Sequence, residues 1–169
     1  MSKKSVLALA LNRKKGLTWV EITLGFIILI LVSIVLTSVF QEGMFRLKKW
    51  RLTNQVTEIS SGADTWKGLK SNFTGLSMTA VCAVGQQSVG ATTCGGAGGT
   101  GANTNAFGGS FELAPASNVS LKSLKITNLP AARVNEIADG LAGMTADQCT
   151  SVTGCSTVTV AGTTLTLTL

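Results

Sequence analysis

The sequence lacks histidine and tyrosine, has only two prolines, and is poor in charge, with charged residues making up 13% of its 169 positions. Histidine is the side chain best suited to proton transfer near neutral pH, so its absence argues against acid–base catalysis. It is also a common zinc ligand, and the four cysteines form no C-x-x-C pair. We therefore expect neither an enzyme nor a cofactor or metal site.

Acidic residues are also few, and the basic residues that outnumber them gather near the N-terminus. The 14 lysines and arginines face 8 aspartates and glutamates, a formal charge of +6. Five of the basic residues precede Leu17, namely Lys3, Lys4, Arg13, Lys14 and Lys15. The basic balance therefore belongs to this N-terminal segment and does not indicate nucleic-acid binding.

Charge is almost missing from Leu17 to Phe40, where Glu21 is the only charged residue. A helix of this length extends about 36 Å, enough to cross a hydrocarbon core of ~30 Å. A carboxylate in such a segment is costly without a partner. The obvious partner is the positive amino group that a cut after Gly16 would create on Leu17. Basic residues before the run favour a cytoplasmic N-terminus, although four more follow it between Arg46 and Arg51.

The apolar run follows a distinctive stretch, Lys14-Lys15-Gly16-Leu17-Thr18-Trp19-Val20-Glu21. Together they resemble the processing signature of type IV pilins and related pseudopilins. In that family a membrane-embedded prepilin peptidase cuts after the glycine and methylates the new amino terminus. The resemblance implies that Gly16 ends a leader peptide and that Leu17 becomes the N-methylated first residue. Glu21 would then be the fifth residue, which pairs with the Leu17 amino group during assembly. The long leader is most similar to that of type IVb pilins.

Beyond Phe40 the apolar residues recur mostly at steps of three and four, which predicts that the helix continues to about Lys70 with one face on a globular head. We assign to this face Leu47, Trp50, Val56, Ile59, Ala63, Trp66 and Leu69. The expected organisation is a leader over 1–16, a transmembrane or filament-core helix over 17–45, and an amphipathic helix half with its head over 46–169. We interpret the basic cluster of residues 46–51 as a collar in solvent or at lipid headgroups, or as a partner for acids of a neighbouring subunit.

The remainder of the chain predicts an α+β fold, with a mainly antiparallel sheet and a second short helix. We expect strands at 78–84, 111–113 and 119–127, a helix that starts near Pro130 and ends at Gly140 or Gly143, and a C-terminal hairpin that turns at Ala161-Gly162. Residues 85–109 are expected to form a flexible surface loop. The G-x-G-x-x-G match within it, Gly96 to Gly101, has no helix-forming sequence after it, so we regard it as accidental.

All four cysteines lie beyond the apolar run, which fits a head in an oxidising compartment. Four cysteines allow three pairings. We expect two structural disulfides between nearest neighbours, Cys82 with Cys94 and Cys149 with Cys155. A zinc site or a redox dithiol is disfavoured, because the spacing and the ligands that such sites use are missing.

The resemblance implies a structural subunit that polymerises through its N-terminal hydrophobic helix into a surface pilus for adhesion, aggregation or related functions. Its partners would be further copies of itself, the prepilin peptidase, the inner-membrane assembly machinery and, before assembly, the membrane; nucleic acid is not expected as a direct partner. The precursor would lie in a bacterial inner membrane with its head outside the cytoplasm, and the filament would be extracellular. Alternatives are a minor pilin, a type II secretion pseudopilin, and an anchored periplasmic binding domain that never polymerises.

Overall fold

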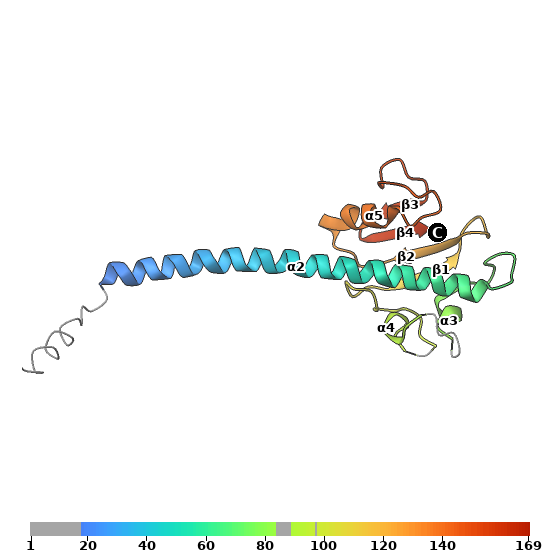
Figure 1. Cartoon of the computed structure of the whole chain (residues 1–169), viewed down its shortest axis with the longest axis horizontal. Helices are drawn as coiled ribbons and strands as arrows, with labels where there is room; N and C mark the ends of the chain where they lie inside the picture. The colour runs from blue at the N-terminus through green and yellow to red at the C-terminus, as the bar shows by residue number, and fades with distance from the viewer. Residues whose placement is uncertain (1–17, 84–88, 97) are drawn as a thin grey trace, which may run out of the picture. The chain divides into compact units, whose positions relative to one another are not determined.

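The computed structural model describes residues 18–83, 89–96 and 98–169. Residues 1–17, to which the sequence assigns the leader and the cleavage site, lie outside this part of the chain. The chain divides into two compact units at Met44 and Phe45. We describe each unit by itself and call the second, Phe45–Leu169, the head (Figure 1).

Helix α2 spans Trp19–Lys67 without a break, so the predicted continuous helix is confirmed over its described length. The helix ends where Gly68 takes a positive φ of 50°, a backbone conformation that glycine adopts without steric cost. Residues up to Lys70, which the sequence includes in the helix, form a turn instead. The glycines inside the helix do not interrupt it, and Gly62 is buried in the core of the head.

The head portion of α2 buries one face. Its buried residues are Phe45, Leu52, Gln55, Val56, Ile59, Gly62 and Ala63. From Leu52 onward they are spaced one to four positions apart, as on one face of a helix. The apolar members belong to the same core as the buried residues of the sheet. This confirms a packed helical face in the head and places Val56, Ile59 and Ala63 on it, as predicted.

Three residues that the sequence assigns to this face are not on it. Leu47 and Trp50 are 61% and 67% exposed, and Leu69, beyond the end of the helix, is fully exposed. Positions six residues apart, such as Trp50 and Val56, are about 120° apart around a helix, so the two cannot share a narrow face. The predicted core role of Trp50 is therefore wrong, whereas Trp66 does pack partly buried against the core.

Four antiparallel strands form one sheet in the order β1-β2-β4-β3. They are β1 (Phe111–Pro115), β2 (Lys122–Ile126), β3 (Val158–Ala161) and β4 (Thr164–Thr168). On the two central strands every second residue is buried, including Leu124 on β2 and Leu165 on β4. The C-terminal hairpin is confirmed, with Ala161 opposite Thr164 at its turn. Together with α2, the sheet confirms the predicted α+β fold.

The strand predicted for residues 78–84 is wrong over its described part, 78–83. Met78–Val81 form a single helical turn, α3, in which the Ser77 side chain accepts a hydrogen bond of 3.1 Å from the backbone N–H of Ala80. Serine in this position is a favourable helix N-cap. A short apolar run cannot by itself distinguish a strand from a buried helical turn, so the capping serine was the more informative signal.

The stretch predicted as a flexible surface loop contains a second helical turn, α4 (Ala91–Cys94), and an ordered segment around Asn105. Asn105 is 5% exposed. Its side-chain oxygen accepts from the backbone N–H groups of Phe107 and Gly109, and its amide donates to the carbonyl of Thr127. The segment around Asn105 is therefore fastened to the chain next to the end of β2. The G-x-G-x-x-G match follows α4 and not a strand, which agrees with its being accidental.

The predicted helix near Pro130 is confirmed as α5 (Val134–Ala142), and Gly143 follows its last residue. One 3-10 turn, η1 (Ala131–Arg133), precedes it. The strand predicted over 119–127 is shorter, because residues 116–121 form a turn closed by a hydrogen bond from Leu121 N to Asn118 O. The strand predicted at 111–113 extends to Pro115.

Two disulfides cross-link the head, Cys82 to Cys94 and Cys149 to Cys155. These are the nearest-neighbour pairs that the sequence analysis expects. The first joins the ends of the helical turns α3 and α4, and the second closes the loop before β3. Each disulfide closes a short loop, which lowers the entropy of the unfolded chain.

Candidate functional site

The most prominent surface of the molecule is the apolar portion of α2 that precedes the head. Its large apolar side chains between Trp19 and Phe40 are 41–79% exposed within the described chain. This is the one described helix that is long and apolar enough to cross a membrane, with a mean hydropathy of 2.8 and nothing in its most apolar window buried. Apolar surface gains about 25 cal/mol per Å² when it is removed from water. The segment is thus a candidate membrane anchor and needs a cover of lipid or protein.

Glu21, the single acid in this surface, belongs to a helix cap. Its Oε2 accepts hydrogen bonds from the backbone N–H of Thr18 at 2.8 Å and from the Thr18 hydroxyl at 3.1 Å. The Thr18 Oγ1 in turn lies 3.4 Å from the backbone nitrogen of Glu21. This reciprocal arrangement is a capping box, which satisfies N–H groups that the first turn of a helix leaves unpaired.

The capping box gives Glu21 a local role that the sequence analysis missed. The T-x-x-E spacing immediately before an apolar run is the signal that could have revealed it. Leu17, the expected partner of Glu21 in the assembled state, lies outside the described residues together with Gly16, so their predicted roles remain predictions.

Next to Glu21, the helix surface has a shallow apolar depression. Glu21, Ile22, Gly25, Phe26 and Leu29 line it. A Cβ atom built on Gly25 would meet nothing within 4 Å, so the missing side chain leaves an open gap between its neighbours. A gap bordered by residues one turn apart can accept an apolar side chain of a second helix. The apolar gap at Gly25 thus lies beside the Glu21 carboxylate on the same helix surface.

Glu58 fastens the helical turn α4 to the head portion of α2. Its carboxylate accepts hydrogen bonds from the backbone N–H of Gly90 and from the Thr93 hydroxyl, the latter at 2.6 Å. Gly90 stands at the N-terminal end of α4, where an acidic group also interacts favourably with the unpaired N–H groups. The helical turn α4 is therefore held against α2 by a side chain that sequence reasoning did not identify.

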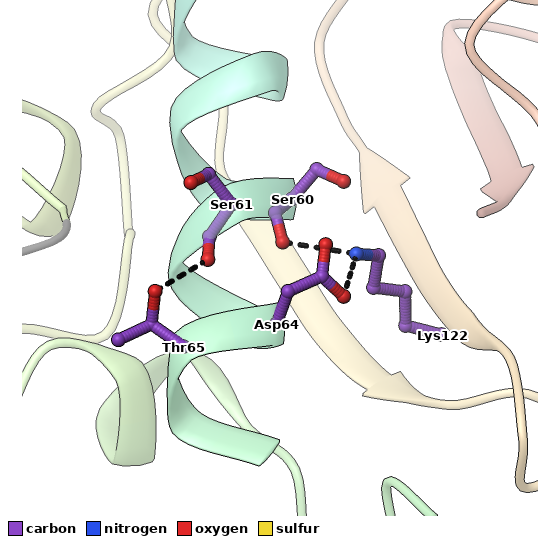
Figure 2. Close-up of polar contacts among 5 residues, drawn as sticks. All are labelled: Ser60, Ser61, Asp64, Thr65 and Lys122. Atoms are coloured by element: carbon purple, nitrogen blue, oxygen red, sulfur yellow. Dashed lines mark hydrogen bonds and ion pairs between the residues drawn. The ribbon is translucent and has the colours of Figure 1, made fainter. Parts of the chain in front are cut away.

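A second polar contact joins α2 to the sheet. Figure 2 shows the side chain of Lys122, from β2, directed at two oxygens of α2. Its Nζ lies 2.6 Å from Oδ1 of Asp64 and 2.9 Å from the carbonyl oxygen of Ser60. The Lys122 side chain is only 6% exposed, whereas that of Asp64 is 60% exposed. A nearly buried ammonium requires such partners, so this contact fixes how the helix sits on the sheet within the head.

The predicted site residues thus fall into separate groups. Glu21 lies on the apolar helix, and the four cysteines form the two disulfides of the head. In the described residues no group of three or more acidic, cysteine or histidine side chains could hold a metal ion. The described residues thus provide an exposed apolar helix and a head that two disulfides cross-link.

Comparison with known proteins adds no relative: no family model, curated protein or solved structure matches this chain.

Proposed function

We propose that this chain is the structural subunit of a type IV pilus of the IVb type, and that it polymerises through the apolar portion of α2 into a surface filament. The observation that carries the proposal is the exposed apolar helix, which continues without a break into a helix half packed in a disulfide-linked head. An anchor alone would need the apolar run, but not the processing motif in front of it or the acid at Glu21.

The apolar helix would be covered in two successive environments. In the unassembled subunit, lipid tails of a bacterial inner membrane cover the apolar helix. The head would then lie outside the cytoplasm. In the filament the helices of other copies cover the apolar helix. Lipid tails are as apolar as leucine, so exchanging one cover for the other gains little from the hydrophobic effect itself. Packing complementarity and charge pairing would then determine how the subunits fit together.

Glu21 would supply the charge pairing. Desolvation of an ionised carboxylate in a helical core is costly unless a cation lies close to it. Cleavage after Gly16 creates such a cation on Leu17, the residue next to Thr18. In assembly the carboxylate would exchange its hydrogen bonds to Thr18 for an ion pair with the Leu17 amino group of a neighbouring copy. The gap at Gly25 would accept an apolar side chain of that neighbour.

The expected partners are therefore further copies of this chain, a prepilin peptidase and an inner-membrane assembly machinery. A minor pilin or a secretion pseudopilin would share the same apolar helix and the same processing. An anchored binding domain that never polymerises would need neither cleavage nor Glu21.

Two measurements on cells that produce the chain test the proposal. N-terminal sequencing of the membrane-borne protein should begin at Leu17, with a methylated amino group. Electron microscopy of material sheared from the cell surface should show filaments that contain the chain. An uncut chain that begins at Met1 would eliminate the pilin proposal in favour of a plain anchor. A cut chain that is missing from every filament would indicate a pseudopilin-like role.

A further inference from the structure

Two asparagines of the head begin the pattern N-x-S/T, the acceptor sequence for N-linked glycosylation. The two sequons are residues 118–120, Asn-Val-Ser, and residues 72–74, Asn-Phe-Thr. No other asparagine of the chain stands in this pattern. A three-residue pattern arises often by chance, so the place of each sequon in the fold decides whether a glycosylating enzyme can use it.

Asn118 begins the tight turn between β1 and β2. The backbone N–H of Leu121 donates to the Asn118 carbonyl at 2.9 Å and closes this turn. The backbone N–H of Ser120 donates to the side-chain Oδ1 of Asn118 at 3.1 Å, which makes an Asx turn. Nδ2 of Asn118 has no hydrogen-bond partner within the described chain. The amide nitrogen that a glycan would join therefore stands unpaired on an exposed residue.

The sequon at residues 72–74 has the same local geometry but belongs to the core. The backbone N–H of Thr74 donates to Oδ1 of Asn72, also at 3.1 Å. Phe73 between them is 4% exposed, and the ammonium groups of Lys67 and Lys122 lie 4.6 and 5.5 Å from the centre of its ring. An enzyme that bound this sequon would have to pull Phe73 out of the core. The chain thus contains a matched control for the Asn118 sequon.

The Asn118 sequon can be bound without disturbing the core. Val119, its middle residue, is 42% exposed, and residues 116–121 contribute none of the buried side chains of the head. A backbone hydrogen bond of 2.8 Å from Phe73 N to Val119 O joins the turn to its neighbour segment. Exposed turns of small and polar residues are also where a chain tolerates added groups best. A glycan on this turn would extend into solvent and leave the packed side chains in place.

The compartment of the head also matters, because N-linked glycans occur on surface loops of secreted proteins. The two disulfides of the head fit an oxidising compartment outside the cytoplasm. The inference therefore rests on the extracytoplasmic head of the proposed function. It does not depend on cleavage after Gly16 or on polymerisation.

We propose that Asn118 is an N-glycosylation site of the folded head, and that the donor is an oligosaccharide on a polyisoprenyl diphosphate lipid. Nδ2 of Asn118 attacks the anomeric carbon of the first sugar and forms a C–N bond. The bond from that carbon to the diphosphate oxygen breaks, and the lipid diphosphate leaves with the electron pair. A base of the transferase takes the proton that Nδ2 loses. Asn72 stays unmodified as long as the head is folded.

The first test uses the full chain in detergent, a synthetic polyprenyl-diphosphate disaccharide and a transferase that requires the N-x-S/T pattern alone. Peptide mass spectrometry should find the disaccharide on Asn118 and not on Asn72. The reduced and denatured chain should be modified at both, since unfolding exposes the second sequon. Ser120→Ala should abolish modification of Asn118, whereas Ser120→Thr, which restores the hydroxyl, should retain it.

Two results of this experiment overturn the inference. If Asn118 is modified in the denatured chain but not in the folded chain, or in neither, the folded turn is not an acceptor. If Asn72 is modified as fully as Asn118 in the folded chain, burial of Phe73 does not select between the sequons. Both cysteine pairs must be intact in the folded sample, as non-reducing peptide mapping shows.

The second test uses cells that produce the chain together with the same transferase and lipid-linked glycans outside the cytoplasm. A chain glycosylated at Asn118 but never cut after Gly16 supports the site and overturns the pilin proposal. Filaments built from chains with unmodified Asn118 overturn the site alone. A chain with reduced cysteines and no glycan overturns the extracytoplasmic head and the site together.

Discussion

Lys122 Nζ lies 2.6 Å from Oδ1 of Asp64 and connects a central strand of the sheet to the head portion of α2. The two partners differ sharply in burial, because the lysine side chain is 6% exposed and the aspartate side chain is 60% exposed. Removing one partner is therefore not equivalent to removing the other. A buried charge that loses its partner is penalised, whereas an exposed charge that loses its partner is rehydrated.

This asymmetry leads to the first prediction. Asp64→Ala should lower the free energy of unfolding of the head by about 1–3 kcal/mol, because the Lys122 ammonium keeps the Ser60 carbonyl as its one hydrogen-bond acceptor, with the Phe73 ring 5.5 Å away. Lys122→Met replaces the buried cation by an apolar chain of similar size and should cost less than Asp64→Ala. Denaturant unfolding of the detergent-solubilised chain compares the two. If Lys122→Met lowers the free energy of unfolding more than Asp64→Ala does, the ion pair itself stabilises the head.

The second prediction concerns the contact between Glu58 and Gly90. A Cβ at position 90 would lie 2.8 Å from Glu58 Oε1, so Gly90→Ala should displace the carboxylate from its donors. We expect the free energy of unfolding to fall by about 1.5–3 kcal/mol, the usual contribution of hydrogen bonds to a charged group. Glu58→Ala should cost a similar amount.

A double-mutant cycle checks this interpretation. Once Glu58→Ala has removed the carboxylate, Gly90→Ala should add little further loss, because the group it would displace is gone. Gly90 has a φ of −69°, which alanine adopts without strain, so Gly143→Ala, at a φ of −67° and with no neighbouring atom closer than 3.9 Å, is the matched control for the added methyl group. If the losses of unfolding free energy from Glu58→Ala and Gly90→Ala simply add in the double variant, Gly90 acts independently of Glu58.

The third prediction is a pH dependence from Asp139. Its pKa lies below the ordinary 3.8, mainly because its carboxylate accepts the backbone N–H of Val152 and also because it accepts the Ser151 hydroxyl. A lowered pKa in the folded state contributes stability above the unfolded pKa, and this contribution is lost as the pH falls through the folded value. Asp139→Asn should therefore reduce the Tm at neutral pH, and the difference from wild type should shrink below about pH 3.8. Thermal unfolding across this range measures it; a difference that grows in acid contradicts the assignment.

The fourth prediction concerns processing. If a peptidase cuts after Gly16 in a narrow site, the branched side chain of Gly16→Val should block the cut. The full-length precursor should then accumulate in the membrane, as detected by the mass of the purified chain. Mature protein of normal mass from this variant would show that the cut lies elsewhere.

The fifth prediction tests the role of Glu21 in assembly. Glu21→Val makes the helix more apolar and leaves the head untouched, so processing, membrane insertion and both disulfides should persist. Filaments should be few or missing, because the Leu17 amino group of the neighbour would lose its partner. The count of filaments by electron microscopy measures this.

Two further variants control for the fifth prediction. Glu42→Gln removes a carboxylate from the same helix beyond the apolar run and should assemble far better than Glu21→Val. Thr18→Val removes the hydroxyl from the capping box while Glu21 stays in place, and it should retain filaments if the carboxylate acts through Leu17. Normal filaments from Glu21→Val would mean that packing alone sets the fit of the subunits.

Local patterns in the sequence were sufficient for several elements. The long apolar run with its polar continuation predicted α2, because helical periodicity extends over many turns and averages out single exceptions. Alternation of valine or leucine with threonine predicted the hairpin of β3 and β4, since side chains alternate between the two faces of a strand. Short spacing predicted the disulfide pairs, because neighbours in sequence need little chain entropy to meet.

Only the tertiary structure decided which side of α2 is buried and what holds it. Periodicity ranks residues by spacing, but Trp50 is exposed because the sheet and α5 cover the opposite side, where Leu52 and Ile59 lie. The partners of Glu58 and Lys122 lie far away in the sequence, at Gly90 and Asp64. No local pattern marks such pairs. They form because a buried polar group must find a donor or acceptor wherever the fold supplies one.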